Sequence, residues 1–409
     1  MTIFTKAAAA ALAASLCAGC ATQPPEAVAA ADWEHVRPEA VGLDPAELQD
    51  LVRGIRAGEH SNIHGVLLLR DGKLALEEYF PGADEWRDVR VGSRPVGVTQ
   101  FDANTLHDMR SISKSVVSIL FGIAQSQGLV GGLDQPIVSY FPEYPDLQTD
   151  DRKAIKLRHL LSMTPGLEWD EDSQPYGDPA NSETAMDNSP DRFRYVLERR
   201  IVAKPGTVWA YNGGTTILLG ALPERATKMP LQDYAEKVLF RPLGITQYEW
   251  IRYADGRAIP ASGLRLRPRD LARIAELYLQ NGRWNGRQVV PEGWVKVSTS
   301  PQNPEGFYGF HWWVGGEDAG SWEVALGYGG QRANIQPAKD LIVIITAGLY
   351  SDRNQSAIVT GVLQKCIDAV VKPAAAATST PRWRTHPATS GEARGSPPDR
   401  SGTERKSHM

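Results

Sequence analysis

The sequence predicts an α+β protein with three layers, α-β-α, in which helices flank an antiparallel sheet. Three observations support this class: a hairpin pattern near the N-terminus, an apolar strand-like run near the C-terminus, and mainly helical periodicity between them. Because strands lie at both ends of the folded region, we expect them to join in one sheet. The helical stretch between them, about 126–260, is then an inserted subdomain.

Individual elements follow from local patterns. Residues 65–70 and 73–80 read as strands around Asp71-Gly72, the dipeptide favoured in type I′ hairpin turns. The apolar run at 341–346 suits a buried strand, and 354–371 has helical periodicity. Helices are expected at 111–125, 157–163, 215–228, 231–240 and 268–280.

Composition excludes several classes of function. The 409 residues are 42% hydrophobic and 22% charged, and Lys+Arg 44 against Asp+Glu 48 gives a net charge of −4. Such a chain folds around a large core, and its interspersed charges offer no concentrated basic face for nucleic acid. We expect no nucleic-acid partner.

The first 20 residues have the features of a signal peptide. Lys6 precedes an Ala/Leu run at 7–16, and small residues lead to Cys20. Ala18-Gly19-Cys20 resembles a bacterial lipobox, although Cys17 stands where Leu is usual. Export to the periplasm is expected, with either lipid attachment to the membrane through Cys20 or ordinary cleavage nearby.

Biased composition marks the remaining segments outside the predicted domain. Residues 21–32 are rich in Ala, Pro and Gln and indicate a linker, and 373–409 indicate a disordered tail. The folded domain is therefore expected at 33–372. After cleavage, no apolar run reaches the ~18 residues of a spanning helix.

One motif carries candidate chemistry. The chain has no G-x-S-x-G, HExxH, P-loop or zinc-ligand spacing, but Ser111 and Lys114 form S-x-x-K. On a helix these side chains share a face, and the apolar residues that follow predict a buried helix. Desolvation and the helix dipole should disfavour the Lys114 ammonium, so that the amine acts as a base toward Ser111. The Ser111 N–H, at the helix start, is a candidate oxyanion donor.

Four segments together resemble the serine β-lactamase and penicillin-binding-protein superfamily. The likeness is nearest to its class C-like branch, which includes esterases, D-aminopeptidase-type enzymes and 6-aminohexanoate-dimer hydrolases. It covers about residues 35–370 in the family's order. The segments that carry it are 109–115, 155–169, 205–214 and 325–331.

The resemblance implies roles for particular residues. Ser111 would be the acylated nucleophile, Lys114 its base partner and Tyr211 the second proton carrier. The family pattern Y-x-N reads Tyr211-Asn212-Gly213 here. Either Asn212 supplies the amide that contacts substrate, or that contact is lost.

The third motif departs from the family's Lys-Thr-Gly. This chain has Gly327-Tyr328-Gly329-Gly330, followed by Gln331. A backbone N–H of Gly330 or Gln331 is the expected second oxyanion donor. Without the cation, substrates that carry a carboxylate should bind less well.

Two arginines are candidates to replace the missing cation, and one loop is a candidate rim. Arg265 or Arg332 would restore the carboxylate partner. The loop at 169–191 is rich in Asp and Glu, which indicates either an acidic rim that favours amine-bearing substrates or a solvated surface loop. Candidate substrate contacts on this loop are Trp169, Asp170 and Tyr176, and candidate pocket walls elsewhere are Trp312 and Trp313.

We therefore expect an exported serine hydrolase that forms an acyl-enzyme and cleaves a small ester or amide. No metal or organic cofactor is expected. A DD-peptidase or β-lactamase is the alternative among enzymes. A non-catalytic envelope binding protein is the alternative of another class, against which the three residues Ser111, Lys114 and Tyr211 argue.

Overall fold

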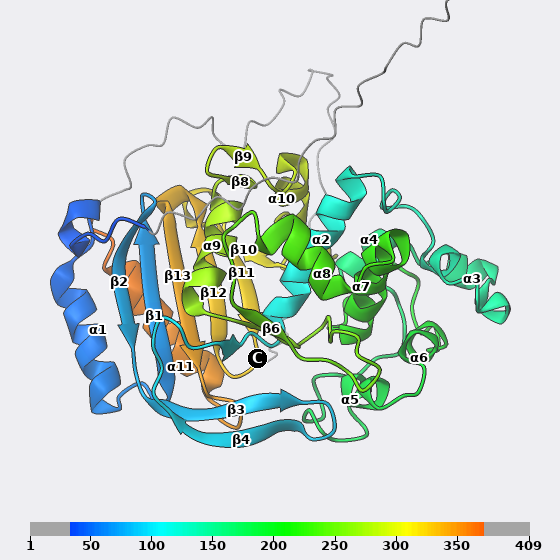
Figure 1. The fold of residues 1–409 in the computed structure, drawn as a ribbon, viewed down its shortest axis with the longest axis horizontal. Helices are drawn as coiled ribbons and strands as arrows, with labels where there is room; N and C mark the ends of the chain where they lie inside the picture. The colour runs from blue at the N-terminus through cyan, green and yellow to red at the C-terminus, as the bar shows by residue number, and fades with distance from the viewer. Residues whose placement is uncertain (1–32, 372–409) are drawn as a thin grey trace, which may run out of the picture. The chain divides into compact units, whose positions relative to one another are not determined.

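A six-stranded antiparallel sheet forms the centre of the protein (Figure 1). The computed structural model describes residues 33–371, so the signal-peptide, linker and tail predictions lie outside the described residues. The strands are, in sheet order, β10 (Trp313–Gly315), β11 (Trp322–Gly327), β12 (Gln331–Gln336), β13 (Leu341–Ala347), β1 (Ile63–Arg70) and β2 (Lys73–Tyr79).

The N- and C-terminal strands meet in the middle of this sheet. β1 pairs with β13, with Leu67 opposite Ile344, and with β2 on its other side. Asp71 and Gly72 have φ angles of 53° and 67°, as a type I′ turn requires. The predicted hairpin, and the prediction of a sheet built from both ends of the chain, are confirmed.

Helices cover both faces of the sheet. Successive residues along a strand therefore point alternately into two different cores. Leu67 and Ile344 face the core that holds α2 (Ile112–Ser126) and α9 (Pro268–Leu279). Their neighbours, such as Leu68, face the core that holds α1 (Pro45–Ala57) and α11 (Gln355–Asp368). Figure 1 shows α1 and α11 on one side of the sheet and α9 with α2 on the other. This is the predicted α-β-α arrangement.

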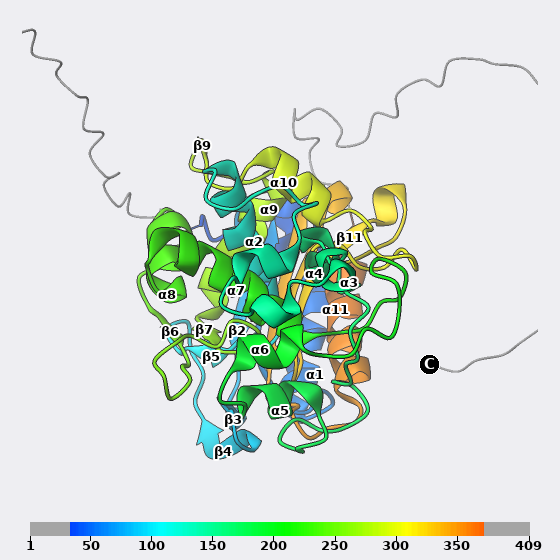
Figure 2. The same cartoon turned by 90° about the vertical axis from the view of Figure 1, so that its right-hand side faces the viewer.

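Between α2 and β7 the regular elements are mainly helices, and Figure 2 shows these helices facing the viewer. Helix α8 continues into a π-helical turn at Glu236–Phe240. Among residues 33–371, no helix has the length and apolar character needed to cross a bilayer. The helices of this region are α3 (Asp150–Lys153), α4 (Leu157–Leu161), α5 (Ser182–Asp187), α6 (Arg192–Leu197), α7 (Gly213–Thr227) and α8 (Leu231–Ala235).

Smaller elements complete the described chain. A ribbon of β3 (Gly82–Asp88) and β4 (Gly92–Thr99) extends along one edge (Figure 1). A three-stranded sheet contains β5 (His107–Asp108), β7 (Leu264–Leu266) and β6 (Tyr248–Trp250). A short hairpin and helix α10 follow α9; their bounds are β8 (Arg283–Trp284), β9 (Arg287–Gln288) and α10 (Glu292–Ser298).

A sharp turn leads from β5 into α2 and presents Ser111. Arg110 has a φ of 49°, a left-handed conformation that costs a non-glycine residue on the order of 1–3 kcal/mol. Its guanidinium holds the turn by donating to the Gly92 carbonyl at 3.2 Å and by lying 4.5 Å from the centroid of the Tyr350 ring. Surrounding contacts thus offset the strain immediately before Ser111.

Helix α2 is buried nearly all round, as the apolar sequence predicted. A Cβ added to Gly122 would lie 2.2 Å from Trp294 of α10. We therefore expect Gly122→Ala to lower the free energy of unfolding by about 1–3 kcal/mol in urea titrations, because the indole has to shift. Gly293→Ala is the matched control, since open space surrounds that position. Equal loss in both variants would contradict the packing argument.

Candidate active site

Ser111 and Lys114 meet at the start of α2. Ser111 occupies the N-cap position, and the Lys114 ammonium donates to Ser111 Oγ at 3.3 Å. The Lys114 side chain is 1% exposed, whereas Ser111 remains partly accessible. The structure therefore places a buried amine against a reachable hydroxyl, the contact that the spacing of the motif predicted.

Two buried carboxylates surround the other side of Lys114. Its Nζ lies 3.4 Å from Glu183 Oε2 and 3.6 Å from Glu171 Oε1. Burial disfavours the ammonium, but Glu183, Tyr211 and Glu171 outweigh it and raise the pKa of Lys114 well above its ordinary value. The expectation of a neutral Lys114 amine was wrong, because the sequence pattern took account of desolvation and not of these carboxylates.

Tyr211 lies beside both residues although it is 100 positions beyond Ser111 in the chain. Lys114 Nζ is 4.8 Å from the centroid of the Tyr211 ring, and Ser111 is close enough to Tyr211 to act on the pKa of its hydroxyl. Burial raises the pKa of Tyr211 to about 12, although Lys114 acts to lower it. At neutral pH Tyr211 is therefore a phenol.

Glu171 and Glu183 are held by further donors. Glu171 Oε2 accepts from the Gly213 N–H at 2.6 Å and from Trp169 Nε1 at 2.9 Å. Glu183 Oε1 accepts from Ser262 Oγ at 3.0 Å. These bonds fix both carboxylates against Lys114.

A glycine at the second motif makes room for this pair. A Cβ on Gly213 would lie 2.3 Å from Glu183 Oε2 and 3.2 Å from Glu171 Oε2. Asn212 is fully buried and its Oδ1 accepts from the Thr215 N–H at 3.1 Å, which caps α7. The amide oxygen is thus used for the helix, whereas the buried Nδ2 atom has no hydrogen-bond partner among residues 33–371. Contact between Asn212 and substrate stays a prediction.

The third motif lies beside the segment that precedes Ser111. A Cβ on Gly327 would be 2.3 Å from the Met109 carbonyl, so only glycine allows this approach. The Gly330 N–H already donates to the Gly327 carbonyl at 3.3 Å, which removes it as the free oxyanion donor. Gln331 is buried, and its side-chain amide bonds Ala347 of β13 at 2.6 Å.

Other groups of the third motif are also engaged. The Gly329 N–H donates to Gln355 at 2.9 Å, and the Tyr328 hydroxyl donates to the Tyr350 carbonyl. The Tyr328 ring stands edge-on to Tyr176, with centroids 5.4 Å apart. Tyr176 and Tyr328 thus bring the loop and the third motif together.

Neither candidate arginine replaces the missing cation. Arg265 Nε lies 2.7 Å from Asp108 Oδ1, and its NH1 pairs with Glu249. Arg332 stands opposite Ile345 in the β12–β13 ladder, and opposed residues share a sheet face. Ile345 faces the core of α1 and α11, so Arg332 points away from Met109 and Ser111.

The acidic loop is only partly a rim. Glu171, Glu183 and Asp187 are buried and paired with cations, whereas Asp170 is exposed and accepts from Ser173. Trp169 and the Tyr176 hydroxyl, which donates to Glu171 Oε1 at 3.0 Å, support the buried pair. Glu171 and Glu183 therefore contact Lys114, and they do not form part of an exposed rim.

Half-buried aromatic rings form a wall beside Tyr211. The Trp313 ring stacks with Tyr211 at a centroid distance of 6.1 Å and with Phe307 at 5.9 Å. Trp209 packs edge-on against Phe307 at 4.9 Å. Trp312 is instead a core residue, 1% exposed. Trp313 is thus placed beside the catalytic candidates, and Trp312 is not.

One group of metal-ligand side chains occurs among residues 33–371. His64, Asp84 and His107 are buried, with ligand atoms within 4.8 Å of one another. The two rings hydrogen bond at 2.8 Å, closer than the about 3.3 Å between two nitrogens on one tetrahedral zinc. Burial lowers the pKa of His64 to about 2 and of His107 to about 4. A neutral, hydrogen-bonded histidine pair accounts for this group.

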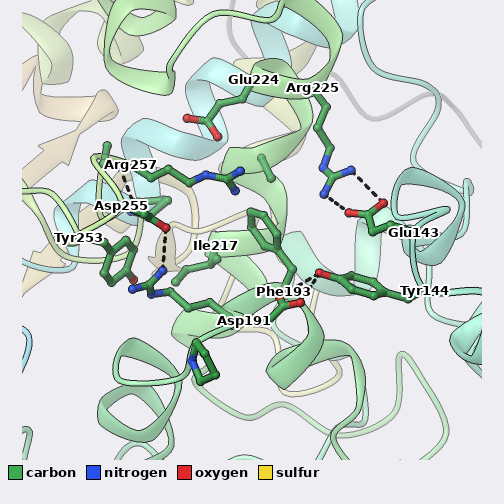
Figure 3. A pocket seen from close by; sticks show the side chains of 15 residues that line it. Glu143, Tyr144, Asp191, Phe193, Ile217, Glu224, Arg225, Tyr253, Asp255 and Arg257 are labelled. Carbon is green, nitrogen blue, oxygen red and sulfur yellow. Dashed lines mark hydrogen bonds and ion pairs between the residues drawn. The ribbon is translucent and has the colours of Figure 1, made fainter.

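A separate cavity of about 280 Å³ lies among α6, α7 and the segment before β7 (Figure 3). Phe193 and Ile217 form its apolar centre. Its walls contain ion pairs, including that of Arg192 with Asp255 at 3.0 Å. None of Ser111, Lys114 and Tyr211 lines it.

The family model described as Beta-lactamase matches residues 48–357, a range that contains the whole site. The chain belongs to the beta-lactamase family. The fold brings Tyr211 to Ser111 and Lys114 from a distant segment.

Individual relatives agree with this assignment. A 6-aminohexanoate-dimer hydrolase of Paenarthrobacter ureafaciens is 24% identical over 60% of this chain and 66% of its own length. Esterase EstB of Burkholderia gladioli is 24% identical over 50% of this chain and 54% of its own. The matches thus span about half to two thirds of these curated relatives.

A solved structure shows the same fold. A Bacillus anthracis protein assigned to the 6-aminohexanoate-dimer hydrolases has a TM-score of 0.63 with 18% identity, covering 77% of this chain and 81% of that one. The predicted family and the predicted mixed fold are confirmed.

Sequence reasoning missed the roles of Glu171 and Glu183. Nothing local separates these residues from the exposed acids around them, because their burial comes from contact with α2 and α7. The glycine at position 213 was the available signal, since it leaves space that a side chain has to fill.

The buried cluster yields a stability prediction. We expect Lys114→Met to lower the free energy of unfolding by about 3–5 kcal/mol at pH 8, because two buried carboxylates lose their cation. The carboxyl pKa values in this folded variant rise above the unfolded value, so the loss should shrink at pH 5. Urea titration at both pH values tests this, with exposed Lys153→Met as control. A loss independent of pH would contradict the ion-pair argument.

Proposed function

We propose that the protein is an exported serine hydrolase that forms an acyl-enzyme and cleaves a small ester or amide. The observation that carries the proposal is the 3.3 Å contact between Lys114 Nζ and Ser111 Oγ, with the Tyr211 ring centroid 4.8 Å from the same nitrogen. Ser111 is the nucleophile, since hydroxyls need an adjacent proton carrier to attack a carbonyl. The names of the two curated relatives support both ester and amide chemistry.

The proposed reaction has two halves. Ser111 Oγ attacks the carbonyl carbon, its proton leaves by way of the Lys114 and Tyr211 side chains, and a proton returns by way of them to the leaving alkoxide or amine. Water then attacks the acyl-enzyme by the same route and releases the acid. The Ser111 N–H at the start of α2 is available to stabilise the oxyanion.

The surroundings favour uncharged acyl groups. Trp209, Phe307 and Trp313 offer an apolar wall beside Tyr211. The third motif lacks a cation, and Arg265 and Arg332 are engaged or directed elsewhere. These observations support esterase or short-amide hydrolysis over β-lactam recognition, which needs a partner for a carboxylate.

Export and anchoring are also proposals, supported by the signal-like segment that ends at Cys20. Lipid attachment at Cys20 would hold the enzyme at the envelope. Cell fractionation of the wild type and of Cys20→Ala distinguishes an anchored protein from a free one.

The nucleophile assignment has a direct test. We expect Ser111→Ala to abolish turnover and fluorophosphonate labelling while the fold stays intact, because Oγ is the only atom that forms the covalent bond. Peptide mapping of the labelled wild-type protein identifies the modified serine. Labelling that persists at another serine in the variant would overturn the assignment.

Substrate class gives a second test. We expect kcat/KM for a short nitrophenyl ester to exceed that for nitrocefin by at least about tenfold, or ~1.4 kcal/mol, because no cation receives the β-lactam carboxylate. Steady-state kinetics with both substrates measures this ratio. Efficient nitrocefin hydrolysis would favour the β-lactamase alternative.

A further inference from the structure

The resting charges around Ser111 leave a proton unaccounted for. When Ser111 Oγ bonds to the acyl carbon, its hydrogen has to leave. Lys114 is already an ammonium, and Tyr211 is a phenol with a pKa of about 12, so neither accepts a proton as it stands. An acceptor beyond them is required.

Geometry identifies that acceptor. The Lys114 Nζ atom lies 3.3 Å from Ser111 Oγ on one side and 3.4 Å from Glu183 Oε2 on the other. Glu171 Oε1 lies 3.6 Å from the same nitrogen, and a side-chain hydrogen bond joins the two glutamates. One ammonium therefore touches both the serine and a coupled carboxyl pair.

We propose that Glu171 and Glu183 form a proton-sharing pair that accepts a proton from Lys114 as Ser111 attacks, so that Lys114 relays the proton of the serine. This inference rests on the proposed function. Both glutamates act through Lys114 and touch no substrate atom, which makes them positioning residues.

The step balances without an external reactant. As the Oγ–acyl bond forms, the Ser111 proton moves to Lys114 Nζ, and Nζ gives one of its protons to a carboxylate oxygen. The reverse transfer supplies the proton for the leaving group when its bond to the acyl carbon breaks. The same cycle serves water in deacylation, so the pair ends as it began.

The pair is built to hold one proton near neutral pH. Burial and the Glu183 charge raise the pKa of Glu171 to about 8, although Lys114 acts to lower it. Burial also opposes ionisation of Glu183, but Lys114 and neighbouring donors outweigh it and lower its pKa to about 2. Gly213 creates the space for both carboxylates, since any side chain there would displace them.

Other ionisable groups face the pair and titrate elsewhere. Arg87 NH2 lies 3.5 Å from Glu183 Oε1 and stays charged. Asp187, which pairs with Arg87, has a pKa raised to about 6 by burial. Burial keeps the nearby tyrosines protonated, and these are Tyr176, Tyr211, Tyr253 and Tyr308. A transition above pH 7 therefore belongs to the glutamate pair.

The test is the pH profile of kcat/KM for a short nitrophenyl ester between pH 6 and pH 9.5. We expect the wild-type rate to rise with pH and level off above a midpoint near pH 8, because the doubly ionised pair is the stronger base. Glu171→Gln should abolish this rise and lower kcat by at least about tenfold. Glu183→Gln should move the midpoint at least one pH unit lower, because Glu171 loses its like-charged neighbour.

Controls separate this proposal from a structural role and from the proposed function. Glu168→Gln, at an exposed neighbour paired with Arg200, should keep the wild-type profile. If Glu171→Gln does not fold, the midpoint of the pH profile in Glu183→Gln still tests the relay: an unchanged midpoint would contradict it. Infrared difference spectra between pH 6 and pH 9.5 should show a carboxylic-acid band that is absent in Glu171→Gln.

A wild-type profile in both glutamate variants would overturn the relay. If Ser111 still takes the fluorophosphonate label in that case, the proposed function survives and only the relay fails. If fluorophosphonate does not label Ser111 in the wild-type protein, the proposed function itself fails, and the relay fails with it.

Discussion

The rest of the site depends on one buried ammonium held between two carboxylates. Moving a single charge into a protein interior costs several kcal/mol, so Lys114 is stable there only with Glu171 and Glu183 in place. These contacts fix the Nζ position and hence its 3.3 Å approach to Ser111. The chemistry of the serine therefore depends on the packing of segments that are distant from it in the sequence.

Those segments come from separate parts of the fold. Helix α2 carries Ser111 and Lys114, the loop before α5 and α5 itself carry the glutamates, and Tyr211 precedes α7. The sheet supplies the opposite wall, since β11 ends with Gly327 against the Met109 carbonyl. The turn at Arg110, between Met109 and Ser111, has a strained backbone conformation, and hydrogen bonds of the Arg110 side chain offset the energy of that strain.

Two of the motifs show how this chain differs from the family that it resembles. At the second motif, Gly213 replaces an amide with space, and the carboxylate pair fills it. At the third motif, no cation is present, and an aromatic wall borders Tyr211 instead. Charged side chains are thus found on the buried side of Lys114 rather than at the third motif.

The sequence by itself determined the family, the mixed fold and the contact between Ser111 and Lys114. Hairpin chemistry at Asp71-Gly72, helical periodicity and i, i+3 spacing are local properties, and local rules predict them. Only the tertiary structure decided the charge of Lys114, the cap role of Asn212 and the direction of Arg332. Each of these depends on neighbours that are distant in the chain. The pKa of a group is set by the charges that the fold brings within a few ångströms of it. The acidic residues of one loop cannot be told apart in the sequence, because only packing decides which of them are buried.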